Sequence, residues 1–363
     1  MTKELYIGIM SGTSLDGIDI ALCTIKKGQI VCEASEDYSL PIEIKELTLA
    51  LIGNMIRIKQ IGKLDYKIAQ LYASLVNDCI KKWNLLPSDI CAIGSHGQTV
   101  WHEPDGKYPF SMQLGNPSLL AALTGIDVVA NFRTKDIAYG GQGAPFAPAF
   151  HQELFGDIEQ CAVVNIGGMA NITVLGKELI GYDTGCGNVL MDLWINECLG
   201  KPYDDRGYWA STGKVNEVLL NNLLSDNYFK LKYPKSTGRE YFNKSFLRNY
   251  LEPLDKIADE DVQATLLALT AHSIANEIKK FNIKELLVCG GGAKNDHLMA
   301  SLQTLLPKID INPTSRYGIN VDSLEAMIFA WLAYKRLNKE TVPLKSVTGA
   351  RKNTILGGIY AAT

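Results

Sequence analysis

The sequence has little excess charge of either sign and no long apolar run. Its 36 basic and 39 acidic residues give a net charge of −3, too small to favour nucleic acid or an anionic membrane as a partner. No apolar stretch approaches the roughly 18 residues of a membrane-spanning helix, and the N-terminal residues lack a secretory signal. We therefore expect a cytoplasmic protein that binds neither nucleic acid nor membrane.

The cysteines form no Cys-x-x-Cys pair, which argues against a zinc ribbon or a thioredoxin-like redox motif. They are scattered through apolar segments, as is typical of reduced, buried thiols in the cytosol. The eight positions are Cys23, Cys32, Cys79, Cys91, Cys161, Cys186, Cys198 and Cys289.

Two common nucleotide-binding motifs are also missing. The dinucleotide fingerprint Gly-x-Gly-x-x-Gly is incomplete at 141–143 and at 185–187, which argues against NAD as a cofactor. Residues 238–245 (GREYFNKS) approach a P-loop, but Asn243 stands at the second glycine position and no convincing strand precedes the segment. We interpret this near-match as fortuitous.

What the sequence does contain is enough material for two α/β domains. Its 363 residues, 47% of them hydrophobic, exceed the usual size of a single core. We predict a first domain at 1–135, with the C-terminal tail 340–363 as a candidate to complete it, and a second domain at 136–339. The glycine-rich segment 140–145 is the predicted hinge.

Both halves begin alike, with a strand, a glycine-rich turn and a second strand. These hairpins are predicted at 5–9 and 18–24, and again at 161–166 and 170–175. Apolar periodicity predicts a helix over 64–83. Further elements are strands at 30–34, 90–94 (followed by a polar turn at 95–98), 127–131, 179–182 and 285–289, and helices at 188–199, 262–281, 295 onward and 322–337.

Three glycine-rich turns are candidate phosphate sites: 11–14 (SGTS), Gly167 with Gly168, and 290–292 (GGG). Without bulky side chains, successive backbone N–H groups can converge on phosphate oxygens, and Ser or Thr hydroxyls add donors. Taken singly, each turn is better explained as a tight connection, because glycine is the usual residue in strained turns.

Together, the two hairpins and the glycine triplet resemble the actin, hexokinase and heat-shock chaperone superfamily of ATPases. That resemblance implies two ribonuclease H-like domains with an active-site cleft between them. Within the superfamily, nearly the whole chain is similar to the anhydro-N-acetylmuramic acid kinase family. The matching stretches are 10–17 (MSGTSLDG), 94–98 (GSHGQ), 141–145 (GQGAP), 165–168 (NIGG), 183–188 (DTGCGN), 290–292, 322–326 and 346–349 (SVTG).

The resemblance implies that ATP, water and 1,6-anhydro-N-acetylmuramic acid give N-acetylmuramic acid 6-phosphate and ADP, in the recycling of peptidoglycan. Oxygen 6 of this sugar is tied to the anomeric carbon, so ring opening must accompany phosphoryl transfer. A general base must then activate water, and we expect Asp183 to act as that base. The alternative is that Asp183 or Thr184 merely caps the next helix.

The other site residues follow from the same resemblance. ATP is expected to contact Gly12, Thr13, Ser14, Leu15, Asp16, Gly17, Ile18, Asp19, Gly167, Gly168, Gly290, Gly291 and Gly292. On the sugar side we expect His96, Arg133 and Glu325. Arg133 suits the lactyl carboxylate, because a guanidinium can bind a carboxylate bidentately. Glu325 has a competing explanation as half of a capping box with Asp322.

Metal binding is less determined, because both hairpins lack the Asp-x-Gly common in the superfamily. The Mg²⁺ ligands are therefore unknown, although Asp16 and Asp19 are candidates to orient the ion or its waters. We also expect the domains to close on substrates, and the resemblance suggests a homodimer. Two other functions stay open: a kinase for another sugar or an acyl acid, and a non-catalytic actin-like ATP switch.

Overall fold

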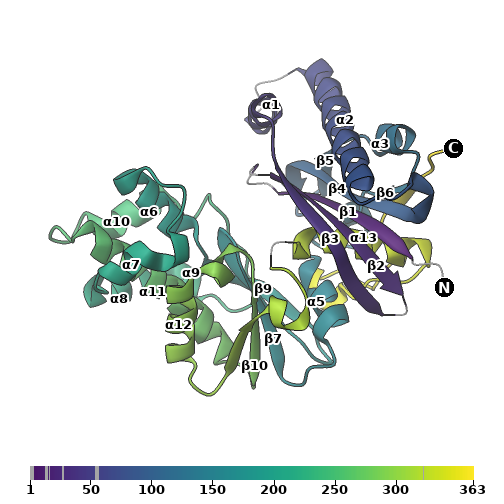
Figure 1. Cartoon of the computed structure of the whole chain (residues 1–363). Helices are drawn as coiled ribbons and strands as arrows, with labels where there is room; N and C mark the ends of the chain where they lie inside the picture. Colours follow the sequence, from purple (N-terminus) through teal and green to yellow (C-terminus); the bar gives the residue numbers. More distant parts are fainter. Residues whose placement is uncertain (1–3, 13–14, 16, 27, 54–56, 322) are drawn as a thin grey trace. The chain divides into compact units, whose positions relative to one another are not determined.

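The computed structural model describes residues 4–12, 15, 17–26, 28–53, 57–321 and 323–363. The chain divides into two compact units, each described by itself below (Figure 1). The first comprises Met1–Leu154 and Ser323–Thr363, and the second comprises Phe155–Asp322. In the part of the chain that is described, no helix combines the length and the apolarity needed to cross a membrane.

The first unit is built on a sheet of seven strands among its described residues. In this sheet β1 is antiparallel to β2, and β2 to β3, whereas β4 runs parallel to β1 and β6 parallel to β4. Strands β5 and β12 add antiparallel partners to β4 and β6. The strands are β1 (Leu5–Ser11), β2 (Gly17–Lys26), β3 (Gln29–Ser39), β4 (Ile90–Glu103), β5 (Phe110–Leu114), β6 (Val128–Ala130) and β12 (Gly358–Tyr360).

The second unit repeats this arrangement in a sheet of five strands, counted over its described residues. Strands β7, β8 and β9 form an antiparallel meander, and β10 and then β11 extend it in parallel from β7. The strands are β7 (Cys161–Ile166), β8 (Met169–Val174), β9 (Ile180–Cys186), β10 (Glu285–Cys289) and β11 (Asp310–Pro313). The core of the first sheet has the order β3-β2-β1-β4-β6, and the second sheet has the order β9-β8-β7-β10-β11. Counted from the first strand of each unit, both follow the order 3-2-1-4-5 of a ribonuclease H-like domain. The predicted α/β class with two such domains is confirmed, and the cleft between them stays a prediction.

Helices cover both faces of the first sheet. Successive strand residues point to opposite faces, so Ile7 and Ile9 pack in the core that includes α2, whereas Gly8 faces α13 (Figure 1). A Cβ atom on Gly8 would lie 1.9 Å from the Ala326 carbonyl oxygen, so glycine is required for α13 to approach the sheet. The helices are α1 (Ile42–Ile52), α2 (Ile58–Lys82), η1 (Pro87–Asp89), α3 (Pro117–Thr124), α4 (Arg133–Ala138), α5 (Ala147–Phe155), α13 (Leu324–Leu337) and α14 (Lys345–Thr348).

In the second unit, the long helix α11 forms the centre of the core. Its apolar side chains, such as Leu266 and Ile274, pack in one cluster with Ala162, Val164 and Ile166 of β7. Helices α6, α7, α8 and α12 pack against it (Figure 1). The helices of this unit are α6 (Val189–Leu199), η2 (Asp205–Gly207), α7 (Tyr208–Thr212), α8 (Glu217–Leu224), α9 (Asn227–Lys230), α10 (Lys244–Leu251), α11 (Asp259–Ile278), η3 (Gly291–Lys294), α12 (Asp296–Leu305) and η4 (Thr314–Tyr317).

The boundaries between the units along the chain differ from the predicted ones at 135/136 and 339/340. The chain passes between units at 154/155 and 322/323, because α13 and all of α5 except its last residue belong to the first unit. Lys335 of α13 forms an ion pair with Glu153 of α5 at 3.3 Å. The predicted hinge at 140–145 lies inside the first unit, where Asp136 accepts hydrogen bonds from the Gly143 N–H (2.8 Å) and the Thr348 hydroxyl (2.9 Å).

Two local predictions were wrong, and a third was confirmed but too short. The polar turn expected at 95–98 is part of β4, because Ser95 and Gln98 continue the pairing with β1. The strand expected at 30–34 runs on to Ser39 as β3, paired along its length with β2. Cys91, expected to be buried, is exposed.

Candidate active site

The first glycine hairpin connects β1 to β2. The Gly12 carbonyl accepts hydrogen bonds from the Leu15 N–H (3.3 Å) and from the side-chain amide of Gln98 (3.1 Å). Leu15 has a positive φ of 58°, which is uncommon for a branched side chain, and it is nevertheless buried. The predicted phosphate contacts Thr13, Ser14 and Asp16 lie outside the described residues.

The start of β2 contains three more of the predicted ATP contacts. Gly17 is tight against the next strand, since a Cβ atom there would lie 2.9 Å from the Tyr38 carbonyl oxygen. Ile18 is fully buried in the apolar core, so its side chain serves packing. Asp19 pairs with Met10 across β1 and with Asp37 across β3.

A buried network lies beneath this hairpin and joins His96 to Arg133. The terminal Nη2 of Arg133 lies 2.9 Å from His96 Nε2, and the other ring nitrogen, Nδ1, lies 3.2 Å from the Ser11 carbonyl oxygen. Because a guanidinium can only donate, Nε2 must accept and Nδ1 must carry the proton that it donates to Ser11. The structure therefore brings these two predicted sugar-side residues together.

The electrostatics of this pair follow from its burial. Burial, reinforced by the charge of Arg133, lowers the pKa of His96 to about 3, so the ring is neutral near pH 7. Burial also lowers the pKa of Arg133 to about 10, which still leaves the guanidinium charged. A second N–H group of Arg133, on Nη1, donates to the Gly143 carbonyl at 2.9 Å. His96 thus serves as a neutral hydrogen-bonding link.

The second glycine hairpin connects β7 to β8 and supports the start of α6. The carbonyl of Gly167 accepts the Asn188 N–H at 2.8 Å, and the carbonyl of Gly168 accepts the N–H groups of Gly187 and Val189 at 2.9 and 3.1 Å. The open side of Gly168 faces Arg239, whose nitrogen would lie 3.8 Å from a Cβ atom at this position. A positive charge therefore lies beside this predicted phosphate turn.

The glycine triplet 290–292 combines a packing role with a surface role. A Cβ atom on Gly290 would lie 2.3 Å from Asn165 Oδ1, and one on Gly292 would lie 2.4 Å from the Ile166 side chain. These two glycines let the triplet pack against the end of β7. Gly291 instead has open space, with Asn188 Nδ2 as its nearest neighbour at 3.7 Å.

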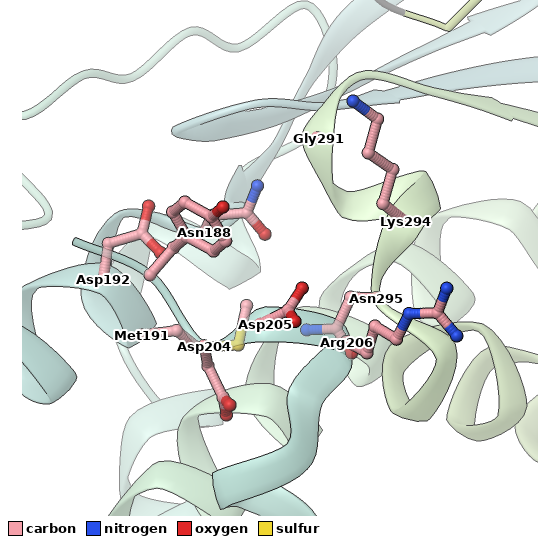
Figure 2. A pocket seen from close by; sticks show the side chains of 10 residues that line it. Asn188, Met191, Asp192, Asp204, Asp205, Arg206, Gly291, Lys294 and Asn295 are labelled. Atoms are coloured by element: carbon pink, nitrogen blue, oxygen red, sulfur yellow. The ribbon is translucent and has the colours of Figure 1, made fainter. Parts of the chain in front are cut away.

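Gly291 lines a pocket of about 370 Å³ in the second unit (Figure 2). Lys294 and Gly291 lie on one side of it, and Asn188 and Asp192 lie on the other. Asp204 is held by the N–H groups of Trp209 and Ala210 at 2.8 and 2.9 Å, so its carboxylate has a structural role. The lining residues are Asn188, Met191, Asp192, Tyr203, Asp204, Asp205, Arg206, Gly291, Lys294 and Asn295.

Asp183 lies within β9, and the carboxylate is only partly exposed. Its Oδ2 accepts the Ser236 hydroxyl at 3.1 Å and the Thr237 N–H at 3.0 Å. Burial raises the pKa of Asp183 above its ordinary value, while these two hydrogen bonds act in the opposite direction. The alternative role as a helix cap is wrong, because α6 has Asn188 at its N-cap position and Thr184 donates to the Ala170 carbonyl.

Glu325 belongs to the first turn of α13 in the first unit, where it is exposed. Its predicted capping partner Asp322 lies outside the described residues. Ser323 occupies the N-cap position of this helix, without a capping hydrogen bond from its side chain. The capping-box explanation therefore stays a prediction.

The arrangement of carboxylates limits how Mg²⁺ can be held. No group of three or more His, Cys, Asp or Glu side chains that could enclose a metal ion occurs among the described residues. Mg²⁺ commonly keeps several waters and binds through substrate phosphates with only one or two carboxylates. The side chains present fit that mode of binding, with Asp19 as the described carboxylate nearest to the first hairpin in sequence.

The sequence did not identify several residues that the structure brings to these sites. Ser236 and Thr237 contact Asp183 from a segment more than 50 residues away, as the separations of 53 and 54 show. Arg239 belongs to residues 238–245, which resemble a P-loop. That resemblance did not predict that Arg239 lies beside Gly168. Asn188 is the last residue of the motif 183–188, so the sequence did indicate that it belongs to a site, and it lines the pocket.

Comparison with known proteins places the chain in a family. Residues 4–362 match the family model described as anhydro-N-acetylmuramic acid kinase. The anhydro-N-acetylmuramic acid kinase of Sulfurovum sp. (strain NBC37-1) is 54% identical, with 99% of this chain and 100% of the relative covered. That of Sulfurimonas denitrificans (strain ATCC 33889 / DSM 1251) is 49% identical, with the same coverage.

Among solved structures, the chain is similar to component A of the (R)-2-hydroxyglutaryl-CoA dehydratase of Acidaminococcus fermentans. The identity is 13%, the TM-score is 0.46, and 93% of this chain and 100% of that chain are covered. This likeness is too distant to carry a functional argument. The family model and the close relatives cover almost every residue, so the chain belongs to the anhydro-N-acetylmuramic acid kinase family.

Proposed function

We propose that the chain uses ATP and water to open 1,6-anhydro-N-acetylmuramic acid and to phosphorylate its O6, giving N-acetylmuramic acid 6-phosphate and ADP. Membership of the family makes the chain a kinase. The observation that carries the proposed reaction is the carboxylate of Asp183, held by two donors in a partly buried position beside the β7–β8 hairpin.

In the proposed reaction, Asp183 removes a proton from a water molecule as the water oxygen attacks the anomeric carbon. The bond from that carbon to O6 breaks, and O6 attacks the γ-phosphorus of ATP, so that ADP leaves. The proton on Asp183 passes to solvent after the turnover. A raised pKa suits this role, because a base is most effective when its pKa approaches the working pH.

We propose that ATP binds with its adenosine in the pocket beside Gly291. Asn188, Asp205 and Lys294 offer polar groups for the base and the ribose. The glycine hairpins then bind phosphate oxygens through backbone N–H groups, and Arg239 adds positive charge beside Gly168. Mg²⁺ bound to the phosphates would neutralise part of their charge.

For the sugar, we propose that His96 and Arg133 act as a preorganised pair. Two of the five guanidinium N–H donors serve His96 and Gly143, which leaves a second N–H on each terminal nitrogen for the lactyl carboxylate. The buried Nε atom of Arg133 has no hydrogen-bond partner among the described residues, which supports a guanidinium kept in place for a ligand. Glu325 remains the third proposed sugar contact.

The decisive test is mass spectrometry of the product formed in ¹⁸O-labelled water. The expected product carries phosphate at O6 and solvent oxygen at the anomeric carbon in the same molecule. ADP release with glucose or acetate, but not with the anhydro sugar, would favour a kinase for another substrate. ATP hydrolysis that no sugar stimulates would favour an actin-like switch.

We further propose that the enzyme works in the cytoplasm as a homodimer, as the family resemblance suggests. Cell fractionation with an antibody to the chain tests the first point, and light scattering coupled to gel filtration tests the second. A scattering mass near the 39.9 kDa of one chain would exclude the dimer.

A further inference from the structure

A buried ion pair joins Lys235 to Glu277 in the second unit. Lys235 Nζ lies 2.8 Å from Glu277 Oε1, and the two side chains are only 2% and 5% exposed. Lys235 follows α9, whereas Glu277 belongs to the last turn of α11. Burying two charges is unfavourable unless their geometry is good and their remaining hydrogen-bonding groups are satisfied.

The hydrogen-bonding groups of Glu277 are satisfied, and one of its partners is Tyr182, which precedes Asp183 in β9. Its second oxygen, Oε2, accepts hydrogen bonds from the Tyr182 hydroxyl at 2.9 Å and from Lys280 at 2.5 Å. Burial raises the pKa of Glu277, but the hydrogen bonds from Lys235, Lys280 and Tyr182 outweigh it, so the pKa is lowered overall. Glu277 is therefore ionised near pH 7.

Lys235 is connected to Asp183 through its backbone. Its carbonyl oxygen accepts the Asp183 N–H at 3.1 Å, so the connection runs along the edge of β9. The next two residues, Ser236 and Thr237, donate to the Asp183 carboxylate. Lys235 Nζ also lies 4.9 Å from the centre of the Tyr228 ring, and the hydroxyl of Tyr228 donates to the Asp183 carbonyl at 2.8 Å.

We propose that the Lys235–Glu277 pair is a positioning device for Asp183. It anchors residues 235–237 so that the Thr237 N–H and the Ser236 hydroxyl hold the Asp183 carboxylate in one orientation. An apolar pair could fill the same space, but it would not fix the connection along β9, because dispersion contacts are not directional whereas an ion pair with hydrogen bonds is. This proposal rests on the proposed role of Asp183 as the general base.

The test compares the double variant Lys235→Met/Glu277→Leu with wild type. This variant removes one charge of each sign, so it leaves no buried charge unpaired and preserves the net charge near Asp183. Leu269→Ala is the matched control: Leu269 is a fully buried residue of the same helix, so this variant lowers stability without touching the anchor. The readouts are the melting temperature, kcat, the KM for ATP, and the pH dependence of kcat.

For the double variant we expect a folded protein whose kcat falls about ten- to a hundredfold, while the KM for ATP changes less than twofold. The acid limb of the pH profile should move upward by about one pH unit. Asp183 acts as a base only when deprotonated, and looser hydrogen bonds from Ser236 and Thr237 stabilise its carboxylate less, which raises its pKa. The ionisable groups around Asp183 are Tyr182, Tyr228, Lys235, Glu240 and Glu277.

Leu269→Ala should lower the melting temperature and leave the acid limb in place. A double variant with wild-type kcat and pH profile would overturn the positioning proposal, and so would an equal shift of the limb in Leu269→Ala. Failure of the proposed function looks different: in that case Asp183→Asn itself keeps its activity, or no sugar stimulates ADP release. Activity lost in Asp183→Asn but kept in the double variant overturns the positioning proposal alone.

Discussion

Asp183 and Asp37 occupy the same place in the two repeated sheets, but only Asp183 has the surroundings of a base. In the second unit, Asn165 of β7 pairs with Asn171, which pairs with Asp183. In the first unit, Met10 pairs with Asp19, which pairs with Asp37. The first residue of each set lies two residues before a hairpin glycine: Asn165 before Gly167, and Met10 before Gly12.

The difference lies in what covers the third strand. Residues 235–237 run along the edge of β9, and Ser236 and Thr237 donate to the Asp183 carboxylate, which is partly buried and has a raised pKa. Asp37 on β3 is exposed. The duplicated fold therefore supplies two similar carboxylates, and a connection outside the repeat distinguishes them.

The largest expected effect comes from replacing these two carboxylates in turn. Asp183→Asn should reduce kcat about 10²- to 10⁴-fold, because the amide cannot accept the proton of the attacking water. Asp37→Asn is the matched control and should stay within twofold of wild type. Steady-state release of ADP with the anhydro sugar measures both, and equal losses in the two variants would contradict the comparison.

The central strands of the two units also differ, at Gly8 of β1 and Val163 of β7, each two residues before Met10 or Asn165. Gly8→Ala should lower the free energy of unfolding by about 3 kcal/mol, because its Cβ atom would meet the Ala326 carbonyl oxygen of α13. Urea unfolding measures the change.

Gly62→Ala in α2 is the control for this change. Among the described residues, no atom beyond the helix's own backbone and the two chain neighbours lies within 4 Å of a Cβ atom at Gly62, so alanine should stabilise the helix by about 0.5–1 kcal/mol. A Gly8→Ala variant as stable as wild type would mean that α13 does not need this close approach.

The next prediction concerns the pH dependence of stability, to which the buried histidines and Asp183 contribute with opposite signs. The pKa values of His96 and His151, both in the first unit, are lowered by burial to about 3. At these two positions the unfolded chain therefore binds more protons than the folded one between pH 6.5 and 3, so the contribution of each histidine to stability falls as the pH falls through this window. Each histidine should lower the free energy of unfolding by up to about 1.4 kcal/mol per pH unit.

Thermal unfolding of wild type and His96→Gln at pH 7 and pH 5 tests this prediction. The variant should lose less stability than wild type on acidification, because one of the groups that takes up a proton on unfolding is gone. Asp183, whose pKa is raised, acts in the opposite direction. An unchanged loss in His96→Gln would show that His96 is not kept neutral by the fold.

The smallest effect is expected at the second hairpin, where Arg239 lies beside Gly168. Arg239→Gln should raise the KM for ATP about tenfold, since a charge-assisted hydrogen bond to phosphate is lost. Arg248 is the control: it is exposed and lies 3.9 Å from Glu197, so Arg248→Gln should leave the KM unchanged. A KM for ATP that is the same in both variants would remove Arg239 from the phosphate site.

The sequence by itself determined the features that depend on local patterns. Strand β10 was predicted with its observed ends, and the amphipathic α2 and the two glycine hairpins were recognised from the spacing of apolar residues and glycines. Asp183 was predicted to be a site residue through a motif next to these elements. Such patterns persist in the folded chain because each one involves neighbouring residues.

Only the tertiary structure decided how distant segments meet. It assigned α13 to the first unit, through a close approach that needs Gly8, and it joined His96 to Arg133 in one buried network. It also brought Ser236 and Thr237 to Asp183, which sets the environment of that carboxylate. These contacts span tens to hundreds of residues, and no local spacing records which segment will cover which strand.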